Sequence, residues 1–342
     1  MANKTCIGHT TDKEQTRKHT SLIFIVSVCL LVVFMYLNTV VGSAIKFKDI
    51  THFLSGHVDS DTILLLRDVR LPRMVAAIVI GGAFAVSGLL MQAMTRNPLA
   101  SPKIFGVTSG ASFVIVLITV LLPSLSYFST LLAMIGAFLG GLTVYILSGS
   151  TKGITPVKIA LAGMSVHLFY MSMTEGIIIL NENSNQEVMF WLVGSLASMQ
   201  WNQVLQVLPV IMIATILALI IGRQLSILEL GDDIARSLGQ HTNRIRLLIG
   251  LIVIMLTGSS VAIAGPIGFI GLIIPHIVKG YVSHNYAIMV PLTFILGANL
   301  LLISDVLSRL ITYPYESPVG IVTSFVGAMY FLILTIRGVK QL

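Results

Sequence analysis

The 342-residue sequence has very few charged residues: 10% of its side chains are Asp, Glu, Lys or Arg, whereas 55% are hydrophobic. A soluble domain of this length cannot bury so much apolar surface, which excludes an ordinary globular enzyme. The mean hydropathy is +0.93, and apolar runs of about 20 residues, the length that crosses a bilayer core, recur along the chain. The composition therefore predicts an all-α polytopic membrane protein.

Motifs that would give the chain chemistry of its own are also missing. The two cysteines, Cys6 and Cys29, form no metal motif and no plausible disulfide. Neither a GxxxxGK[ST] loop, which cradles nucleotide phosphates, nor a helical HExxH pair occurs. We therefore expect no catalytic residue, no cofactor and no bound metal. If ATP drives transport, a separate subunit must hydrolyse it.

The apolar runs predict ten membrane crossings. They lie near residues 22–42, 72–92, 104–123, 126–148, 156–180, 203–223, 245–263, 286–310 and 320–337, with a shorter one near 270–282. Residues 1–21 are polar and basic and are interpreted as a cytoplasmic tail. A cleaved signal peptide is the alternative, but the apolar run that follows is longer than a typical signal core. Residues 22–342 then form one membrane domain.

Basic residues orient the chain in the membrane. With the N-terminus inside and ten crossings, 15 of the 21 lysines and arginines, including Arg96 and Lys103, fall on the cytoplasmic side. This distribution follows the positive-inside rule and places both termini in the cytoplasm. The net charge of +7 then reflects topology and not nucleic-acid binding. The outer side keeps six basic residues: Lys46, Lys48, Arg67, Arg70, Arg73 and Arg309.

A short charged segment, residues 228–239, interrupts the apolar pattern on the cytoplasmic side. Its apolar residues recur at helical spacing: Leu230, Ile234, Ala235 and Leu238. Asp232 and Asp233 suit the first turn of a helix, and Gly239 can end that helix in a left-handed conformation. A loop that only reverses the chain needs no capped amphipathic helix, so we expect a protein in the aqueous phase to bind this segment.

Glycine and proline have two distinct uses within the predicted spans. Small residues on the second span allow neighbouring backbones to touch: Gly81, Ala85, Ser87 and Gly88. Between residues 265 and 275, glycine and proline interrupt an apolar run, so some backbone groups there need partners outside the helix ladder. Interrupted helices often mark a transport path or gate, and a structural re-entrant turn is the equal alternative.

Two carboxylates fall within or near the predicted spans. Asp305 lies one helical turn before Arg309, a spacing that favours an ion pair. Glu175 is costly at membrane depth, where acidic groups are often functional; it faces either the transport pathway or the outer interface. A proton-coupled secondary transporter that uses Glu175, Asp305, His167 or His276 as a relay is therefore the alternative function, although His276 is better explained as a packed side chain.

Several motifs occur together and in a fixed order. They are Arg70-Leu71-Pro72-Arg73, Arg96-Asn97-Pro98-Leu99-Ala100, Gly106-Val107-Thr108-Ser109-Gly110-Ala111, Trp191-Leu192-Val193-Gly194-Ser195-Leu196, the segment 228–239, Gly265 to His276, Asp305-x-x-x-Arg309 and Pro318-Val319-Gly320-Ile321-Val322-Thr323. From about residue 60 onward the chain resembles the FecCD/BtuC-type membrane permeases of iron-siderophore, haem and vitamin B12 ABC importers. Departures are small: Lys279 stands where arginine is usual, and Ser101 replaces a frequent aspartate.

The resemblance implies a set of partners and a cargo. A second permease subunit would pair with this chain, as a homodimer or a heterodimer, and two cytoplasmic ATP-binding subunits would hydrolyse ATP. An extracytoplasmic substrate-binding protein would deliver a bulky iron chelate, with ferric siderophore as the first choice and haem or cobalamin as alternatives. The segment 228–246 matches the short cytoplasmic helices that dock on the ATPase.

Three groups of site residues follow. ATPase coupling is assigned to Leu228, Leu230, Gly231, Asp232, Ala235, Arg236, Leu238 and Gly239. The resemblance implies that Arg70, Arg73 and Arg309 meet carboxylates of the binding protein, since exposed charges at a rim steer a partner without being buried. Lipid headgroup snorkelling is the alternative for these arginines. A gate or pathway role is assigned to Gly265, Pro266, Gly268, Gly271, Pro275 and Glu175.

Overall fold

The computed structural model describes residues 4–41, 64–149, 155–181, 185–282, 285–313 and 315–339. Every regular element within these ranges is a helix, which confirms the predicted all-α class. Two of the six basic residues assigned to the outer side, Lys46 and Lys48, lie outside the described residues.

The helices account for all ten predicted crossings. In chain order they are α1 (Lys4–Val40), the π-helix η1 (Leu65–Arg70), α4 (Leu71–Thr95), the 3-10 helix η2 (Pro102–Phe105), α5 (Val107–Leu121), the 3-10 helix η3 (Pro123–Phe128), α6 (Ser129–Leu147), α7 (Pro156–Leu180), α8 (Asn185–Val193), α9 (Trp201–Ile220), α10 (Gly222–Glu229), α11 (Asp232–Ser237), α12 (Thr242–Ala264), α13 (Ile270–Tyr281), α14 (Tyr286–Ile311) and α15 (Val319–Val339). Within the described ranges, eight helical stretches are long and apolar enough to cross a membrane, and the shorter apolar helices α5 and α13 lie at the other two predicted spans.

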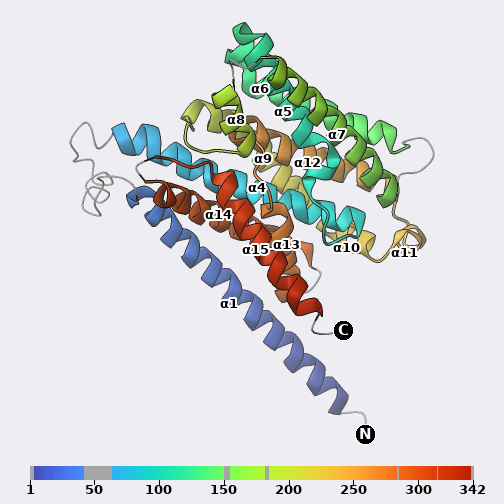
Figure 1. Cartoon of the computed structure of the whole chain (residues 1–342). Coiled ribbons are helices and arrows are strands. Elements are labelled where there is room, and N and C mark those ends of the chain that lie inside the picture. Colours follow the sequence, from blue (N-terminus) through green and yellow to red (C-terminus); the bar gives the residue numbers. More distant parts are fainter. Residues whose placement is uncertain are drawn as a thin grey trace.

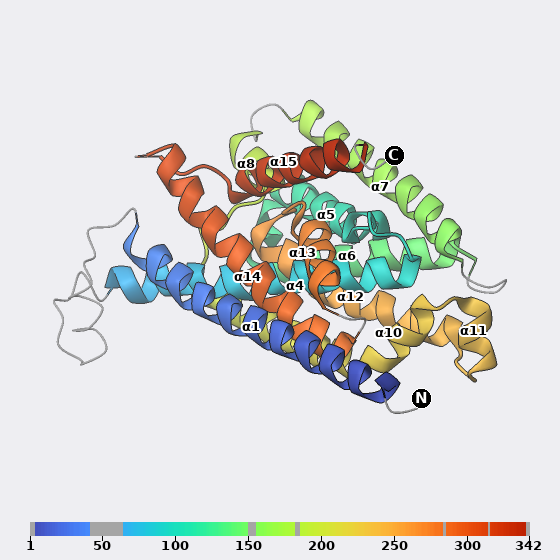
Figure 2. The same ribbon diagram turned by 90° about the horizontal axis from the view of Figure 1, so that it is seen from below.

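The bundle has two ends that collect different parts of the chain. The η1 end contains η1, the start of α4 and the end of α14, and it lies at the left of Figures 1 and 2. The opposite end, here called the α11 end, contains the end of α4 together with α10 and α11. Helix α1 runs parallel to α14, because Asn38 donates to Asp305 while the Ser27 carbonyl, earlier on α1, accepts from Asn299, earlier on α14. The described N-terminal part of the chain therefore starts on the side of the α11 end.

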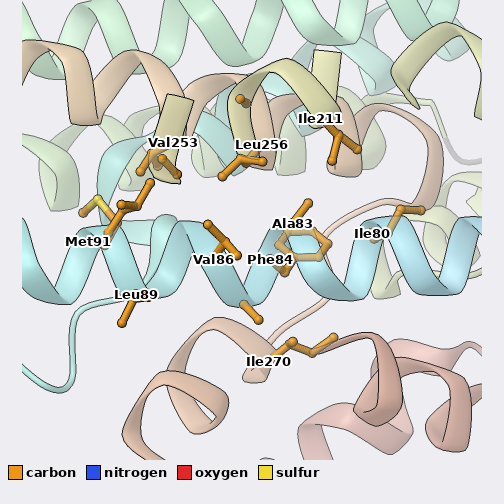
Figure 3. Packing of buried hydrophobic residues seen from close by; sticks show 14 of the residues in the cluster. Ile80, Ala83, Phe84, Val86, Leu89, Met91, Ile211, Val253, Leu256 and Ile270 are labelled. Carbon is orange, nitrogen blue, oxygen red and sulfur yellow. The ribbon is translucent and has the colours of Figure 1, made fainter. Parts of the chain in front are cut away.

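Helix α4 forms the centre of the bundle. Its residues are buried almost continuously from Pro72 to Met94. Apolar side chains from α9 and α12 cover one side of it, and α13 covers another (Figure 3). The labelled residues of this core are Ile80, Ala83, Phe84, Val86, Leu89 and Met91 of α4 with Ile211, Val253, Leu256 and Ile270.

Backbone contact between helices replaces side-chain packing at the glycines of α4. A Cβ on Gly88 would overlap the carbonyl oxygen of Gly271 in α13, and a Cβ on Gly81 would overlap that of Gly297 in α14. Such close approach gains van der Waals contact, which holds helices together in lipid where no hydrophobic force acts between them. The close approach predicted from the small residues of this span is confirmed.

The connection between α4 and α5 enters the bundle instead of staying at its surface. Gly106, directly after η2, packs against Gly140 of α6 and Val166 of α7. Val166 stands ten residues after the start of α7, which is about 15 Å along the helix axis. The span predicted to begin at residue 104 therefore begins as a helix only at Val107. Residues 96–106, here called the re-entrant segment, reach far into the bundle.

The contact at Gly88 generates a first prediction. Replacement of Gly88 by Val would push α4 away from α13, because the clash is with backbone and no rotamer relieves it. We expect a loss of more than about 4 kcal/mol of stability, in the range of severe core defects. Gly176 of α7, where an added Cβ meets nothing within 4 Å, supplies the matched control as Gly176→Val. Thermal unfolding of the purified proteins in detergent measures both, and equal melting temperatures would contradict the contact.

Candidate transport and coupling sites

The charged segment predicted from the sequence folds as two short helices, α10 and α11, which meet at Gly231 (φ +118°). Gly239 ends α11 with φ +81°. The Gly239 N–H donates to the Arg236 carbonyl at 2.9 Å, and the Gln240 N–H donates to the Ala235 carbonyl at 2.9 Å. These two bonds form a Schellman cap, so the predicted left-handed Gly239 is confirmed.

Apolar residues of this segment divide into an inner and an outer set. Leu228 and Ala235 are fully buried against the rest of the chain. In contrast Leu230, Ile234 and Leu238 are 60%, 48% and 62% exposed. The predicted amphipathic pattern therefore attaches the segment through Leu228 and Ala235, and it presents the outer three side chains to whatever lies beyond the chain. Exposed apolar side chains grouped in this way are typical of an interaction site.

Asp232 anchors α11 to two long helices. Its Oδ1 accepts hydrogen bonds from Arg96 Nη2 at 2.6 Å and from Arg246 Nη2 at 2.7 Å. Burial raises the pKa of Asp232, but the hydrogen bond from Arg246 and the charges of Arg246 and Arg96 outweigh that effect, so the net pKa lies below its ordinary value. A carboxylate with a lowered pKa stabilises the fold above its ordinary pKa and loses that contribution only as the pH falls through the lowered one.

A second ion pair joins α10 to α13. Lys279 Nζ lies 3.0 Å from Glu229 Oε1, and both side chains are largely shielded from solvent. Lys279 belongs to the last turn of α13, the helix that follows the glycine–proline interruption. The α10–α11 segment is thus tied to the ends of three helices, α4 and α12 through Asp232 and α13 through Glu229.

The interruption itself spans residues 265–269, between the end of α12 and the start of α13. Gly265 (φ +70°) and Phe269 (φ +67°) turn the backbone there. The Ser195 N–H donates to the Ala264 carbonyl at 2.9 Å, and the Gly320 N–H donates to the Gly194 carbonyl at 3.0 Å. The α8–α9 connection and the start of α15 therefore cover the break, which confirms that its surroundings supply backbone partners outside the helix ladder.

Not every residue assigned to the interruption lies in it. Gly265, Pro266 and Gly268 belong to the break, whereas Gly271 and Pro275 are inside α13. Gly271 packs directly on α4, where a Cβ would lie 2.6 Å from the Phe84 carbonyl oxygen. His276 meets the Tyr330 ring at 6.1 Å between ring centroids, as a packed side chain would.

Two adjoining cavities flank the interruption. The larger has a volume of about 530 Å³ and is lined mainly by α5, α7 and α8 together with Pro266. The smaller, about 130 Å³, is lined by Ile267, Gly268 and Phe269 among others. Glu175 is exposed and lines the larger cavity. Lys103 and Thr108 line both.

At the η1 end, a buried ionic cluster surrounds Asp305, whose side chain is fully shielded. Arg73 donates to Asp305 Oδ1 from Nε at 3.0 Å and from Nη2 at 2.9 Å. Arg309 Nη2 lies 3.1 Å from Asp305 Oδ2, and Asn38 donates to the same oxygen at 2.9 Å. The predicted pair between Asp305 and Arg309 is confirmed, and the cluster joins α1, α4 and α14.

This cluster corrects the expected exposure of the arginines. Arg70, Arg73 and Arg309 were expected to stand as exposed charges at a rim, but their exposed fractions are 7%, 4% and 3%. Buried guanidinium groups need a counter-charge, and Asp305 supplies it once α1 and α14 pack beside α4. Arg73 also pairs with Glu316 at 2.7 Å, and the Glu316 carboxylate is 40% exposed. The solvent-facing group of the cluster is therefore an acid that the sequence analysis did not single out.

These features define a multi-pass membrane transport protein: a helical bundle, an interrupted helix, internal cavities and an anchored amphipathic segment, α10–α11. Its sequence matches the FecCD transport family over residues 29–337. It is 46% identical to the Fe(3+)-citrate import system permease protein YfmD of Bacillus subtilis, over 93% of this chain and 95% of that protein. It is 36% identical to the hemin transport system permease protein HmuU of Yersinia pestis, over 80% of this chain and 84% of that protein.

A solved structure agrees with these sequence matches. A chain described as an inward-facing conformation of a metal-chelate type ABC transporter superposes with a TM-score of 0.82 and 27% identity, covering 93% of this chain and 99% of that one. The chain therefore belongs to the FecCD transport family, whose permeases work within ABC transporters.

The two bonds to Asp232 generate a second prediction. Asp232→Asn removes the negative charge that holds Arg96 and the buried Arg246, so α11 should open more often. We expect amide hydrogen exchange over residues 228–240 to rise about three- to tenfold, since a partly exposed pair contributes about 1 kcal/mol. Asp233→Asn, an exposed neighbour in the same turn, should leave exchange unchanged. Equal exchange in the two variants would show that Asp232 does not anchor the segment.

Proposed function

We propose that this chain is the permease subunit of a binding-protein-dependent ABC importer for a bulky ferric chelate, with ATP hydrolysed by a separate subunit. The observation that carries the proposal is the α10–α11 segment, which is anchored inward and presents Leu230, Ile234 and Leu238 outward. A rigidly anchored segment with an apolar outer face suits docking in a cleft of an ATPase subunit. Family membership points in the same direction.

Movement of the α10–α11 segment could reach the interruption through its ion pairs. A movement of α11 would be transmitted to α4 and α12 through Asp232, and to α13 through Glu229 and Lys279. Helix α13 begins at the break that borders both cavities. Two ATP-binding subunits that alternately separate and close would thus shift the break relative to α4. For the cavity to face each side in turn, the motor must bind the two states with different affinities.

The cargo is proposed to be a ferric siderophore or a ferric citrate complex. Relatives are named as permeases for Fe(3+)-citrate, iron(3+)-hydroxamate and hemin, so the shared feature is iron held by a bulky organic chelator. Ferric citrate is the first probe to use because YfmD, at 46% identity, is named for it.

The remaining assembly follows from orientation. We place the α11 end and both termini in the cytoplasm, with residues 1–21 as a tail and residues 22–342 as the permease domain. The α11 end carries Arg96, Arg236, Arg246 and Lys279, in agreement with the positive-inside rule. The η1 end then faces outward, where a substrate-binding protein would dock near the Arg73–Glu316 pair. A second permease subunit, identical or paralogous, would complete the pathway beside this chain in the bilayer.

A proton relay remains the competing function, and the Asp305 cluster weighs against part of it. Asp305 contacts two guanidinium groups and an amide, and these contacts join α1, α4 and α14, which is a structural role. Glu175 and His167 do line a cavity, so the relay requires a direct test.

Uptake into membrane vesicles that carry the complete transporter distinguishes the two functions. We expect accumulation of ferric citrate to require ATP and to stop with vanadate, because the energy enters through the α10–α11 segment. A protonophore should leave the initial rate unchanged when ATP is present. Uptake that a protonophore abolishes while ATP and vanadate have no effect would establish the proton-coupled alternative.

Replacement of Gly239 tests the role of the α10–α11 segment specifically. Gly239→Val forces a β-branched residue into a left-handed conformation, and the resulting backbone strain should disrupt the Schellman cap. No atom lies within 4 Å of an added Cβ at this position, so the substitution introduces no steric clash beyond that strain. We expect normal membrane insertion with at least about a tenfold loss of uptake per ATP hydrolysed, the effect of a distortion of about 1.4 kcal/mol. Gly239→Asn, which tolerates this conformation, is the matched control and should transport normally. Unchanged coupling in the valine variant would remove the docking role of the cap.

A further inference from the structure

Lys103 occupies a position that its place in the sequence does not suggest. It was expected on the cytoplasmic surface, but the re-entrant segment carries it into the bundle, where it shares the larger cavity with His167 and Thr174 of α7. His167 stands eleven residues after the start of α7, which corresponds to about 16 Å along the axis. An ionisable side chain at such depth is costly and commonly functional in membrane proteins.

The Lys103 ammonium lies against the interruption and is accessible from the cavities. A Cβ on Gly268 would be 3.4 Å from Lys103 Nζ, so the charge is next to the backbone of the break. The side chain is exposed, and it lines both cavities. Within the described residues no carboxylate forms an ion pair with it. The charge therefore faces cavity space without a counter-ion from the described part of the chain.

Two helix N-termini point their positive ends toward the same place. Helix α5 begins at Val107, and Thr108 and Ser109 of its first turn line the cavities. Helix α13 begins at Ile270, and Gly268 and Phe269 directly before it line the smaller cavity. The unpaired N–H groups and the dipole at a helix N-terminus favour anions. A lysine and two helix N-termini thus contribute the same sign of potential to one space.

The ionisable residues that line the larger cavity lie at different positions along its length. Glu175, the acidic residue of its lining, stands eight residues beyond His167 on α7, which is about 12 Å further from the Lys103 side. His167 is half-buried, and within the described residues its buried Nδ1 has no hydrogen-bond partner. The inner part of the cavity can therefore offer donors to an anion, while the acid lies at the far part.

We propose that Lys103, together with the N-termini of α5 and α13, forms an anion subsite for the carboxylate groups of a ferric hydroxycarboxylate chelate. The inference rests on the proposed function and names the chemistry of the cargo that the interior selects. A carboxylate bound there would contact the break at Gly268, so movement of α13 through the Glu229–Lys279 pair would change the subsite that holds the cargo. Such coupling makes binding dependent on the state of the transporter.

The test uses the assembled permease and ATPase complex, unaltered or with Lys103→Gln, in detergent and in proteoliposomes. Equilibrium dialysis with radiolabelled ferric citrate should show about a tenfold weaker retention in the glutamine variant, because a charge-assisted bond is lost. ATP-dependent uptake of ferric citrate should fall by a similar factor. Lys103→Arg should retain most of both, and Lys158→Gln, an exposed lysine at the start of α7, should change neither.

The outcomes separate this inference from the function on which it rests. If the unaltered complex takes up no ferric chelate with ATP, the proposed function fails, while the dialysis still tests the subsite. If uptake occurs and Lys103→Gln binds and carries ferric citrate normally, only the subsite is overturned; lower thermal stability with unchanged binding overturns it as well. Should the glutamine variant not fold, the unaltered complex is compared with ferric citrate and an uncharged ferric trihydroxamate. Equal retention of the two chelates would overturn the proposal, and clear preference for the anionic one supports it.

Discussion

Backbone contact at Gly271 is the constraint on which the other features depend. At this point α13 lies directly against Phe84 and Gly88 of α4, and Pro102 of the re-entrant segment approaches within 3.3 Å of where a Cβ would stand. Lipid supplies no hydrophobic force between helices, so contact of this kind holds them together. One crossing therefore positions the central helix, the helix after the break and the segment that carries Lys103. A larger residue there would separate all three.

Charged side chains at the ends of the bundle and in its interior differ in whether they are paired. At the two ends of the bundle, carboxylates are paired with guanidinium or ammonium groups: Asp305 with Arg73 and Arg309, Asp232 with Arg96 and Arg246, and Glu229 with Lys279. A buried pair is costly to break because either remaining charge would be left uncompensated, and such pairs make the ends stiff. Lys103, in the interior, faces open cavity space instead. A charge that binds a transient ligand must be accessible in this way, whereas a charge that holds helices together is paired within the protein.

Local patterns in the sequence predicted several features that depend on neighbouring residues. Ten crossings follow from runs of apolar residues, the cap at Gly239 from its place after a periodic segment, and the pair of Asp305 with Arg309 from their spacing on one helix. The interruption near residue 265 also follows from glycine and proline in an apolar run. The sequence could not show which distant residues each charged side chain contacts. Asp232 and Arg96 are 136 residues apart, and Arg73 and Asp305 are 232 apart. Glu316 carries no local signal that would reveal its contact with Arg73.

The amino-acid sequence by itself determined the class of the protein, because hydropathy and helix signals act over a few turns and need no knowledge of distant residues. Tertiary structure alone decided which arginines are buried, since burial depends on α1 and α14 packing beside α4. It also decided that Lys103 lies inside the bundle, because a hydrophilic residue in a short loop looks like a surface residue until the loop is seen to fold inward between α6 and α7. The physical reason is the same in both cases: solvation and pairing of a charge depend on the whole three-dimensional surroundings, whereas hydropathy is a property of the local chain.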